Sequence, residues 1–147
     1  IYVGGGNTKS MIAVWRDWGV IEILREAWQS GIVLTGVSAG AICWFEQGLT
    51  DSFSDGLRPL GGLGFLPGSC CPHYDGEVQR RPSLHKLLVS GEISAGVAIE
   101  DWTGVHFIGA EMHNVITSKR GARAYSLRAV HGSVQEVALT AQCLAMD

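Results

Sequence analysis

The stretch Ile32-Val-Leu-Thr-Gly36-Val-Ser38-Ala-Gly40-Ala41 decides the fold of this 147-residue chain. Its first four residues predict the end of a buried strand, because three of them are apolar and the fourth is a threonine. Gly36 to Gly40 match the pattern G-x-S-x-G, and the apolar run at 41–45 predicts the start of a buried helix. A serine between two glycines at a strand-to-helix turn is typical of a nucleophile elbow. The alternative is an ordinary glycine-rich turn, and the flanking strand and helix favour the catalytic interpretation.

Composition excludes several classes of protein. Hydrophobic residues make up 46% of the chain, which is too many for a disordered segment. The net charge of −3, without a long basic run, gives no support to binding of nucleic acid or a membrane surface. No apolar run is long enough for a membrane span, and no signal peptide is visible. We therefore expect a cytoplasmic protein; its oligomeric state stays open, a homo-oligomer included.

The four cysteines, Cys43, Cys70, Cys71 and Cys143, show no C-x-x-C spacing. This argues against a zinc site, and we expect reduced thiols and neither metal nor cofactor. The chain opens directly on Ile1-Tyr2-Val3, which predicts a strand. A parallel strand that is buried on both sides needs neighbours on both sides. We therefore expect residues 1–147 to be a single α/β domain that forms the C-terminal portion of a longer one.

A second glycine-rich turn, Gly4-Gly5-Gly6-Asn7-Thr8, follows the first strand and precedes a predicted helix over Met11–Trp18. Its spacing matches neither the P-loop nor the G-x-G-x-x-G pattern, which argues against a nucleotide site. Backbone N–H groups at such a turn suit an oxyanion beside Ser38, with Asn7 contacting the substrate. The alternative is a tight turn without a ligand.

The order strand–helix–strand–helix with short connections predicts a parallel α/β sheet. Both glycine-rich turns then lie at the carboxyl ends of strands, where such sheets bind ligands. The remaining expectations are a helix over Gly19–Ser30 that ends at Gly31, a loop-like segment packed on the core over Gly48–Pro72, a helix over Leu84–Val89, strands over Gly96–Ile99, Thr103–Ile108, Val115–Thr117 and Ala124–Val130, and a helical or frayed tail over Gln135–Asp147.

A serine nucleophile needs a base and a group that orients the base. Five histidines are candidates, and His73 is favoured over His85, His106, His113 and His131 because it follows Pro72 in a polar loop. Either Glu100 or Asp101, at the end of a predicted strand, can supply the carboxylate. Arg80 and Arg81 are either a reader of a substrate carboxylate or a pair of surface residues.

Three motifs in this order, Gly4-Gly-Gly-Asn-Thr8, Gly36-Val-Ser-Ala-Gly-Ala41 and Pro72-His-Tyr74, resemble peptidase family S51, which includes dipeptidase E and cyanophycinase. The stretch Cys71–Pro82 is similar to the dipeptidase E-like branch. The resemblance covers residues 2–125. It implies a doubly wound, mostly parallel sheet with helices on both faces, related to class I glutamine amidotransferases, from which the N-terminal part is missing.

The resemblance also implies a serine exopeptidase for dipeptides with an N-terminal aspartate. By motif, Ser38 is the nucleophile, His73 the base and Glu100 the triad acid, with Asp101 as the alternative. The N–H groups of Gly6 and Ala39 would form the oxyanion hole. Arg80, or its neighbour Arg81, would bind the aspartyl carboxylate.

Three other functions remain open at this point. They are a hydrolase of cyanophycin or of isoaspartyl peptides, a non-catalytic domain that binds carboxylates or peptides, and a nucleotide-binding role for the first turn. The cyanophycinase interpretation is weakened because Pro72, not Gln, precedes His73.

Overall fold

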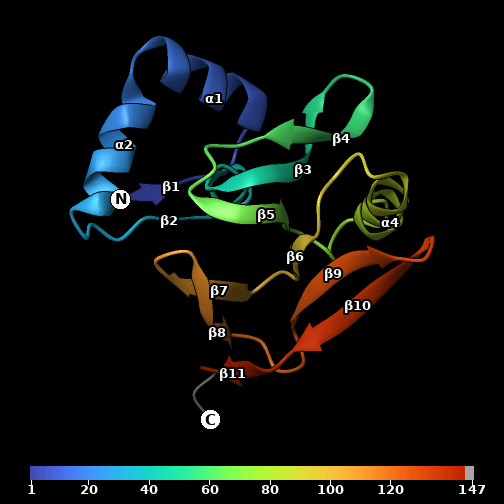
Figure 1. Cartoon of the computed structure of the whole chain (residues 1–147). Coiled ribbons are helices and arrows are strands. Elements are labelled where there is room, and N and C mark those ends of the chain that lie inside the picture. The colour runs from blue at the N-terminus through green and yellow to red at the C-terminus, as the bar shows by residue number, and fades with distance from the viewer. Residues whose placement is uncertain (145–147) are drawn as a thin grey trace.

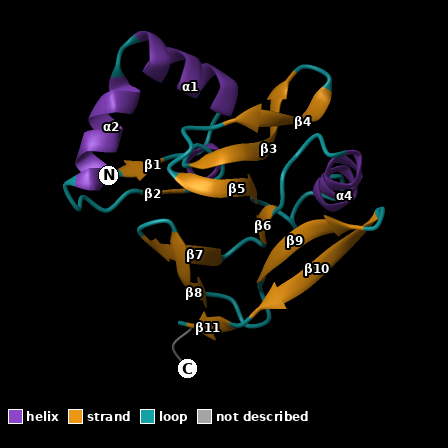
Figure 2. Cartoon of the chain, in the orientation of Figure 1, coloured by secondary structure: helices purple, strands orange, loops and turns teal. Residues whose placement is uncertain are grey.

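The computed structural model describes residues 1–144, which form four helices and eleven strands (Figures 1 and 2). No helix among these residues is long and apolar enough to cross a bilayer. The helices are α1 (Thr8–Asp17), α2 (Val20–Gln29), α3 (Ala39–Ile42) and α4 (Arg80–Ser90). The strands are β1 (Tyr2–Val3), β2 (Thr35–Gly36), β3 (Phe45–Phe53), β4 (Gly56–Gly61), β5 (Leu66–Cys71), β6 (Gly96–Ile99), β7 (Thr103–Ile108), β8 (Glu111–Thr117), β9 (Ala124–Val130), β10 (Ser133–Leu139) and β11 (Ala141–Cys143).

The first helices begin and end where local sequence signals place them. Asn7 caps α1, and its side-chain oxygen accepts the N–H of Ser10 at 2.9 Å. Gly31 follows the end of α2 with a φ of 83°, and its N–H bonds to the Trp28 carbonyl, as predicted for a glycine at this position. The predicted strand at Ile32–Thr35 is mostly wrong, because only Thr35–Gly36 pair with β1.

A six-stranded sheet with the order β10-β9-β6-β5-β3-β4 forms the centre of the molecule. Neighbouring residues on its strands belong to different cores: Cys70 and Val97 pack with α1 and α2, whereas Cys71 and Ala98 pack with α4. Successive side chains of a strand point to opposite faces, so helices cover both faces of this sheet, as expected. Figure 1 shows α1 and α2 on one side and α4 on the other.

The α/β class is confirmed, but the described residues do not form one mostly parallel sheet. A separate pair, β1-β2, and a three-stranded sheet, β11-β8-β7, lie beside the six-stranded one. Of the eight strand pairings among residues 1–144, four are parallel and four antiparallel. Three of the antiparallel pairs, β3-β4, β7-β8 and β9-β10, are hairpins, and the fourth joins β6 to β9.

The loop-like segment expected over 48–72 is instead the hairpin β3-β4 followed by β5. Three of its glycines, Gly48, Gly62 and Gly68, mark close approaches of the backbone. A Cβ on Gly48 would lie 2.4 Å from Cγ2 of Ile42, and one on Gly62 would lie 2.2 Å from the carbonyl oxygen of Phe45. These glycines are thus required by packing, whereas a Cβ on Gly56 or Gly61 would meet nothing closer than 3.9 Å.

The tail expectation is also wrong, since residues 133–139 and 141–143 form β10 and β11. Residues 145–147 of that expectation lie outside the described part of the chain. The helix over α4 and the strands β6, β7, β8 and β9 lie where the sequence predicts them, with α4 beginning four residues earlier and β8 at Glu111.

Candidate active site

Ser38 lies at a sharp turn between β2 and α3. Its φ of 56° and ψ of −115° belong to a region that residues other than glycine rarely adopt. A Cβ on Gly36 would lie 2.3 Å from the carbonyl oxygen of Gly40, and one on Gly40 would lie 2.1 Å from the carbonyl oxygen of Val3. Both glycines are therefore needed sterically. The turn has the strained geometry of a nucleophile elbow, although the helix after it is only four residues long.

His73 and Asp101 are brought together by two neighbouring parallel strands. They follow the carboxyl ends of β5 and β6, which pair with each other in the six-stranded sheet. His73 Nδ1 lies 2.7 Å from Asp101 Oδ1. Gly76 leaves room for this carboxylate, because a Cβ there would lie 2.4 Å from Asp101 Oδ2. If Nδ1 donates its proton to Asp101, Nε2 is left as the proton acceptor.

The structure thus pairs His73 with Asp101, the alternative that the sequence left open, and not with Glu100, which the family resemblance implied as the triad acid. The Glu100 carboxylate accepts the hydroxyl of Tyr125 at 2.9 Å and the backbone N–H of Arg123 at 2.7 Å. Its two oxygens bind β9 and the turn before it. Glu100 therefore fixes the loop after β6, while the next residue reaches the imidazole.

Ser38, His73 and Asp101 line one cavity of about 920 Å³. Of the histidines in the described chain, His106 also lines it, but its ring stacks edge-to-face on His113 with centroids 5.3 Å apart. His85 instead bonds to Glu136. His73 is therefore the cavity histidine with a carboxylate partner, which agrees with its selection from the sequence.

The glycine-rich turn after β1 lies against the serine. A Cβ on Gly5 would lie 3.4 Å from Cβ of Ser38 and 3.8 Å from its Oγ. Gly6 has a φ of 150°, which favours glycine. Ala39 is the first residue of α3, and amides in the first turn of a helix have no acceptor within it. The turn and the start of α3 thus flank Ser38 on two sides.

Asn7 does not line the cavity in the described structure. Its side-chain oxygen caps α1, and its Nδ2 donates to the Ser52 carbonyl at 3.3 Å. From the sequence, Asn7 was predicted to contact the substrate. The structure instead gives it a structural role, tying the first turn to β3.

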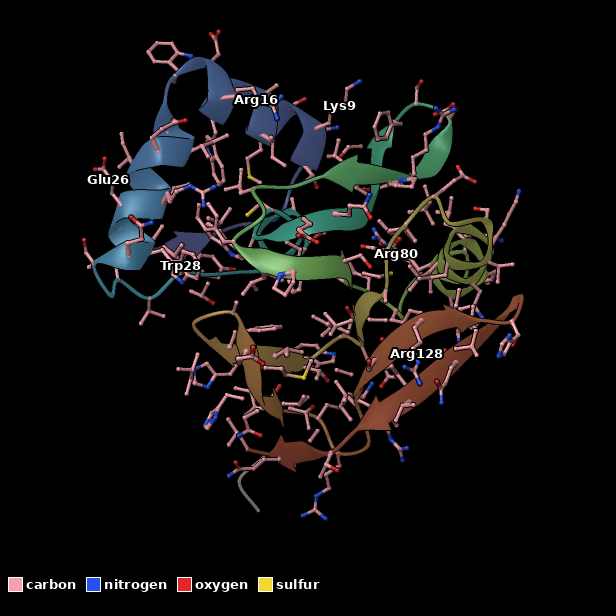
Figure 3. The ribbon with its side chains drawn as sticks, viewed as in Figure 1. Lys9, Arg16, Glu26, Trp28, Arg80 and Arg128 are labelled. Atoms are coloured by element: carbon pink, nitrogen blue, oxygen red, sulfur yellow. The ribbon has the colours of Figure 1, made fainter. Side chains whose placement is uncertain are left out.

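Arg80 and Arg81 are also away from the cavity. Arg80 is 2% exposed; its Nε donates to Glu77 at 2.7 Å and a terminal nitrogen donates to the Leu49 carbonyl at 2.9 Å. Arg81 pairs with Glu136 on β10. In the view of Figure 3, Arg80 lies on the α4 side and Trp28 of the cavity wall on the α2 side, toward opposite ends of β5. Neither arginine lies where the sequence predicted a reader of a substrate carboxylate.

A pair of tyrosines for which the sequence predicted no role supports the two loops of the site. The rings of Tyr74 and Tyr125 lie 5.5 Å apart, and the Arg81 guanidinium lies over both. Tyr74, next to His73, donates its hydroxyl to Glu136 at 2.5 Å. Burial, together with this bond to Glu136, raises the pKa of Tyr74 far above its usual value. Because Glu136 lies in the mispredicted tail, no local sequence signal pointed to it.

The buried cysteines do not provide a competing nucleophile. All four cysteines are free, and burial raises the pKa of Cys43 and of Cys71 to about 12. Desolvation also raises the pKa of Cys70 well above its usual value. Thiols of such high pKa are protonated near neutral pH and are poor nucleophiles.

A serine elbow whose cavity also holds an imidazole paired with a carboxylate is an arrangement that serine hydrolases use. The family model of Peptidase family S51 matches residues 1–115. A protein of Bacillus subtilis (strain 168) named "Uncharacterized peptidase YgaJ" is 46% identical over 144 residues. The chain therefore belongs to peptidase family S51. The aligned region is 98% of this chain and spans 62% of the length of that relative.

Proposed function

We propose that this chain carries the catalytic centre of a serine peptidase for small peptides. Ser38 is the nucleophile, His73 the general base, and Asp101 the carboxylate that orients the base. The observation that carries the proposal is the 2.7 Å contact of His73 with Asp101 in the cavity that Ser38 also lines. The family and the peptidase name of the relative support the same class of reaction.

The mechanism follows from these positions. His73 Nε2 takes the proton of Ser38 Oγ as Oγ attacks the carbonyl carbon of the scissile peptide bond. The negative oxygen that forms is held by the N–H of Ala39 and by an N–H of the glycine-rich turn. The family resemblance implies that this second N–H is that of Gly6. His73 then passes its proton to the leaving nitrogen, the C–N bond breaks, and an ester of Ser38 remains.

Water completes the cycle. His73 takes a proton from water, whose oxygen attacks the ester carbonyl, and the bond to Oγ breaks as Ser38 regains its proton. Asp101 stabilises the imidazolium that exists in each half of the reaction and, by accepting a hydrogen bond from Nδ1, leaves Nε2 to take the proton of Oγ. The carboxylate orients the neutral imidazole in the free enzyme, and its charge contributes most when His73 becomes protonated, which lowers the barrier.

The preference for an N-terminal aspartate is not part of this proposal. It depended on Arg80 or Arg81 binding the aspartyl carboxylate, and both guanidinium groups are engaged by Glu77 and Glu136. A cavity of about 920 Å³ is large enough for a dipeptide or a tripeptide. Small peptides are therefore the substrate class that the site supports.

The test is hydrolysis of a dipeptide panel by the protein and its Ser38→Ala variant. The panel contains Asp-, Glu-, Leu- and Arg-alanine and a β-aspartyl peptide. Loss of a serine nucleophile lowers turnover by about 10⁴ to 10⁶. Ser54→Ala is the matched control, because Ser54 is exposed in the turn between β3 and β4. Activity of Ser38→Ala within tenfold of the parent contradicts the proposal.

A further inference from the structure

The walls of the cavity at Ser38 are mostly apolar. They include Trp28, Trp44, Phe65, Leu66, Ile99 and Phe107. Trp28 stacks on Phe65 with ring centroids 5.4 Å apart and an interplanar angle of 6°, and Trp44 stacks on Phe65 at 5.9 Å. Because these rings pack on one another, they form a fixed aromatic wall that does not need to rearrange for a ligand.

The charges at the cavity have one sign. Glu100 and Asp101 line it, and none of its lining residues in the described chain is a lysine or an arginine. Arg25 lies over the Phe65 ring at 4.6 Å but donates to the Leu63 carbonyl and is not part of the lining. An aspartyl or glutamyl side chain in this cavity would meet two carboxylates and no cation.

We propose that this cavity is the specificity pocket and that it selects peptides whose N-terminal residue is apolar, aromatic or branched aliphatic. The inference rests on the proposed function and names its substrate class. The aromatic wall receives the side chain, and the negative charge of Glu100 and Asp101 attracts the free α-ammonium group of the peptide. The same charge repels an acidic side chain, so specificity comes from attraction and repulsion together.

The size of the preference follows from burial. Transfer of a leucine or phenylalanine side chain out of water favours its peptide over the alanine peptide by about 10- to 100-fold in kcat/KM. An aspartyl peptide lacks this gain and also meets like charge. We therefore expect Phe-Ala and Leu-Ala to exceed Asp-Ala by about 100-fold or more.

Val33 offers a way to add a positive charge to the pocket without disturbing the core. It lines the cavity and is 75% exposed. Val33→Arg places a guanidinium at the rim, and Asp-Ala hydrolysis should then rise at least about tenfold relative to Leu-Ala hydrolysis. Val14→Arg is the matched control, because Val14 is 55% exposed on α1 and does not line the cavity.

The experiment compares kcat/KM for Phe-, Leu-, Ala- and Asp-alanine among the parent, Val33→Arg and Val14→Arg. The expected order is Phe and Leu above Ala, and Ala above Asp, with the ratio shifted by Val33→Arg alone. A parent that cleaves Asp-Ala as well as Leu-Ala overturns the inference but leaves the proposed function intact. An equal shift in both variants also overturns the role of the pocket charge.

A binding measurement separates the two proposals if hydrolysis is absent. The same uncleaved dipeptides are titrated into Ser38→Ala while the fluorescence of the cavity tryptophans, among them Trp28 and Trp44, is followed. Saturable binding of Phe-Ala at least tenfold tighter than that of Asp-Ala supports the apolar pocket even where the proposed function fails. Equal binding, or none, overturns it.

Discussion

Two adjacent carboxylates, Glu100 and Asp101, allow the orienting acid to be identified by a pair of isosteric substitutions. Asp101→Asn removes the charge that lies 2.7 Å from His73 Nδ1. Loss of a fully buried carboxylate of this kind lowers kcat about 10⁴-fold in serine proteases. The Asp101 side chain is 41% exposed, so water replaces part of the lost stabilisation, and we expect a fall of about 10³-fold. That factor corresponds to about 4 kcal/mol in the barrier.

Glu100→Gln should behave differently. A glutamine oxygen still accepts the Tyr125 hydroxyl, and the loop after β6 keeps its link to β9. We expect kcat to change by less than about fivefold and the free energy of unfolding to fall by about 1 kcal/mol, as for the weakening of one hydrogen bond. The assay is kcat and KM on the best dipeptide of the panel, with urea unfolding of each variant. A 10³-fold loss in Glu100→Gln, with Asp101→Asn near parent activity, would refute the pairing.

Three other outcomes follow from contacts in the described chain. Gly40→Ala forces a Cβ to 2.1 Å from the Val3 carbonyl oxygen and should cost about 3 kcal/mol or more in urea unfolding, whereas Gly61→Ala, whose Cβ meets nothing closer than 3.9 Å, should cost under about 1 kcal/mol. Tyr74→Phe removes the donor to Glu136 and should cost about 1 to 3 kcal/mol in the same assay; an unchanged midpoint contradicts the role of that bond. Burial raises the pKa of Cys43 from 9.0 to about 12, so the folded state keeps a proton that the unfolded chain releases, and the stability that Cys43 contributes, full below pH 9, should fall by about 1.4 kcal/mol per pH unit up to pH 12. Cys43→Ala should reduce the slope of stability against pH by about 1.4 kcal/mol per pH unit, which is the contribution of one proton. A slope identical to that of the parent contradicts the burial effect.

The parts of the site that the sequence predicted are those with a local steric signature. The turn at Ser38 needs glycine at positions 36 and 40, because a Cβ at either position would overlap with backbone atoms. His73 follows a strand and sits in a polar loop, and the structure places it in the same cavity as the serine. Such requirements act over a few residues, so they are visible in one sequence.

The parts that were missed depend on partners far along the chain. Glu100 and Asp101 are equivalent by position, and the choice between them is made by Tyr125 of β9 and by Arg123 in the turn before it, which hold Glu100. Arg80 is a plausible substrate reader until its burial against Glu77 and the Leu49 carbonyl is known. Tertiary contacts of this kind leave no periodic pattern in the residues themselves.

The fold shows the same division between local and distant causes. Gly31 predicted the end of α2 correctly, since capping is decided by the nearest residues, whereas Asn7, which caps α1, was expected to contact the substrate. The hairpin β3-β4 was taken for a loop because glycines such as Gly48 and Gly62 are needed where backbones approach closely. Composition alone does not distinguish a glycine in a flexible loop from a glycine that is required because two backbone segments pack closely.

The central claim, that Ser38 is a nucleophile activated by His73 and Asp101, is tested most directly by covalent labelling. The protein is treated with a fluorophosphonate, and the labelled residue is located by mass spectrometry of its peptides. We predict one adduct on Ser38, absent in Ser38→Ala, formed at least about 100-fold more slowly in His73→Ala and left unchanged in rate by His106→Ala. Labelling of another residue, or labelling of Ser38 at the parent rate in His73→Ala, would contradict the account.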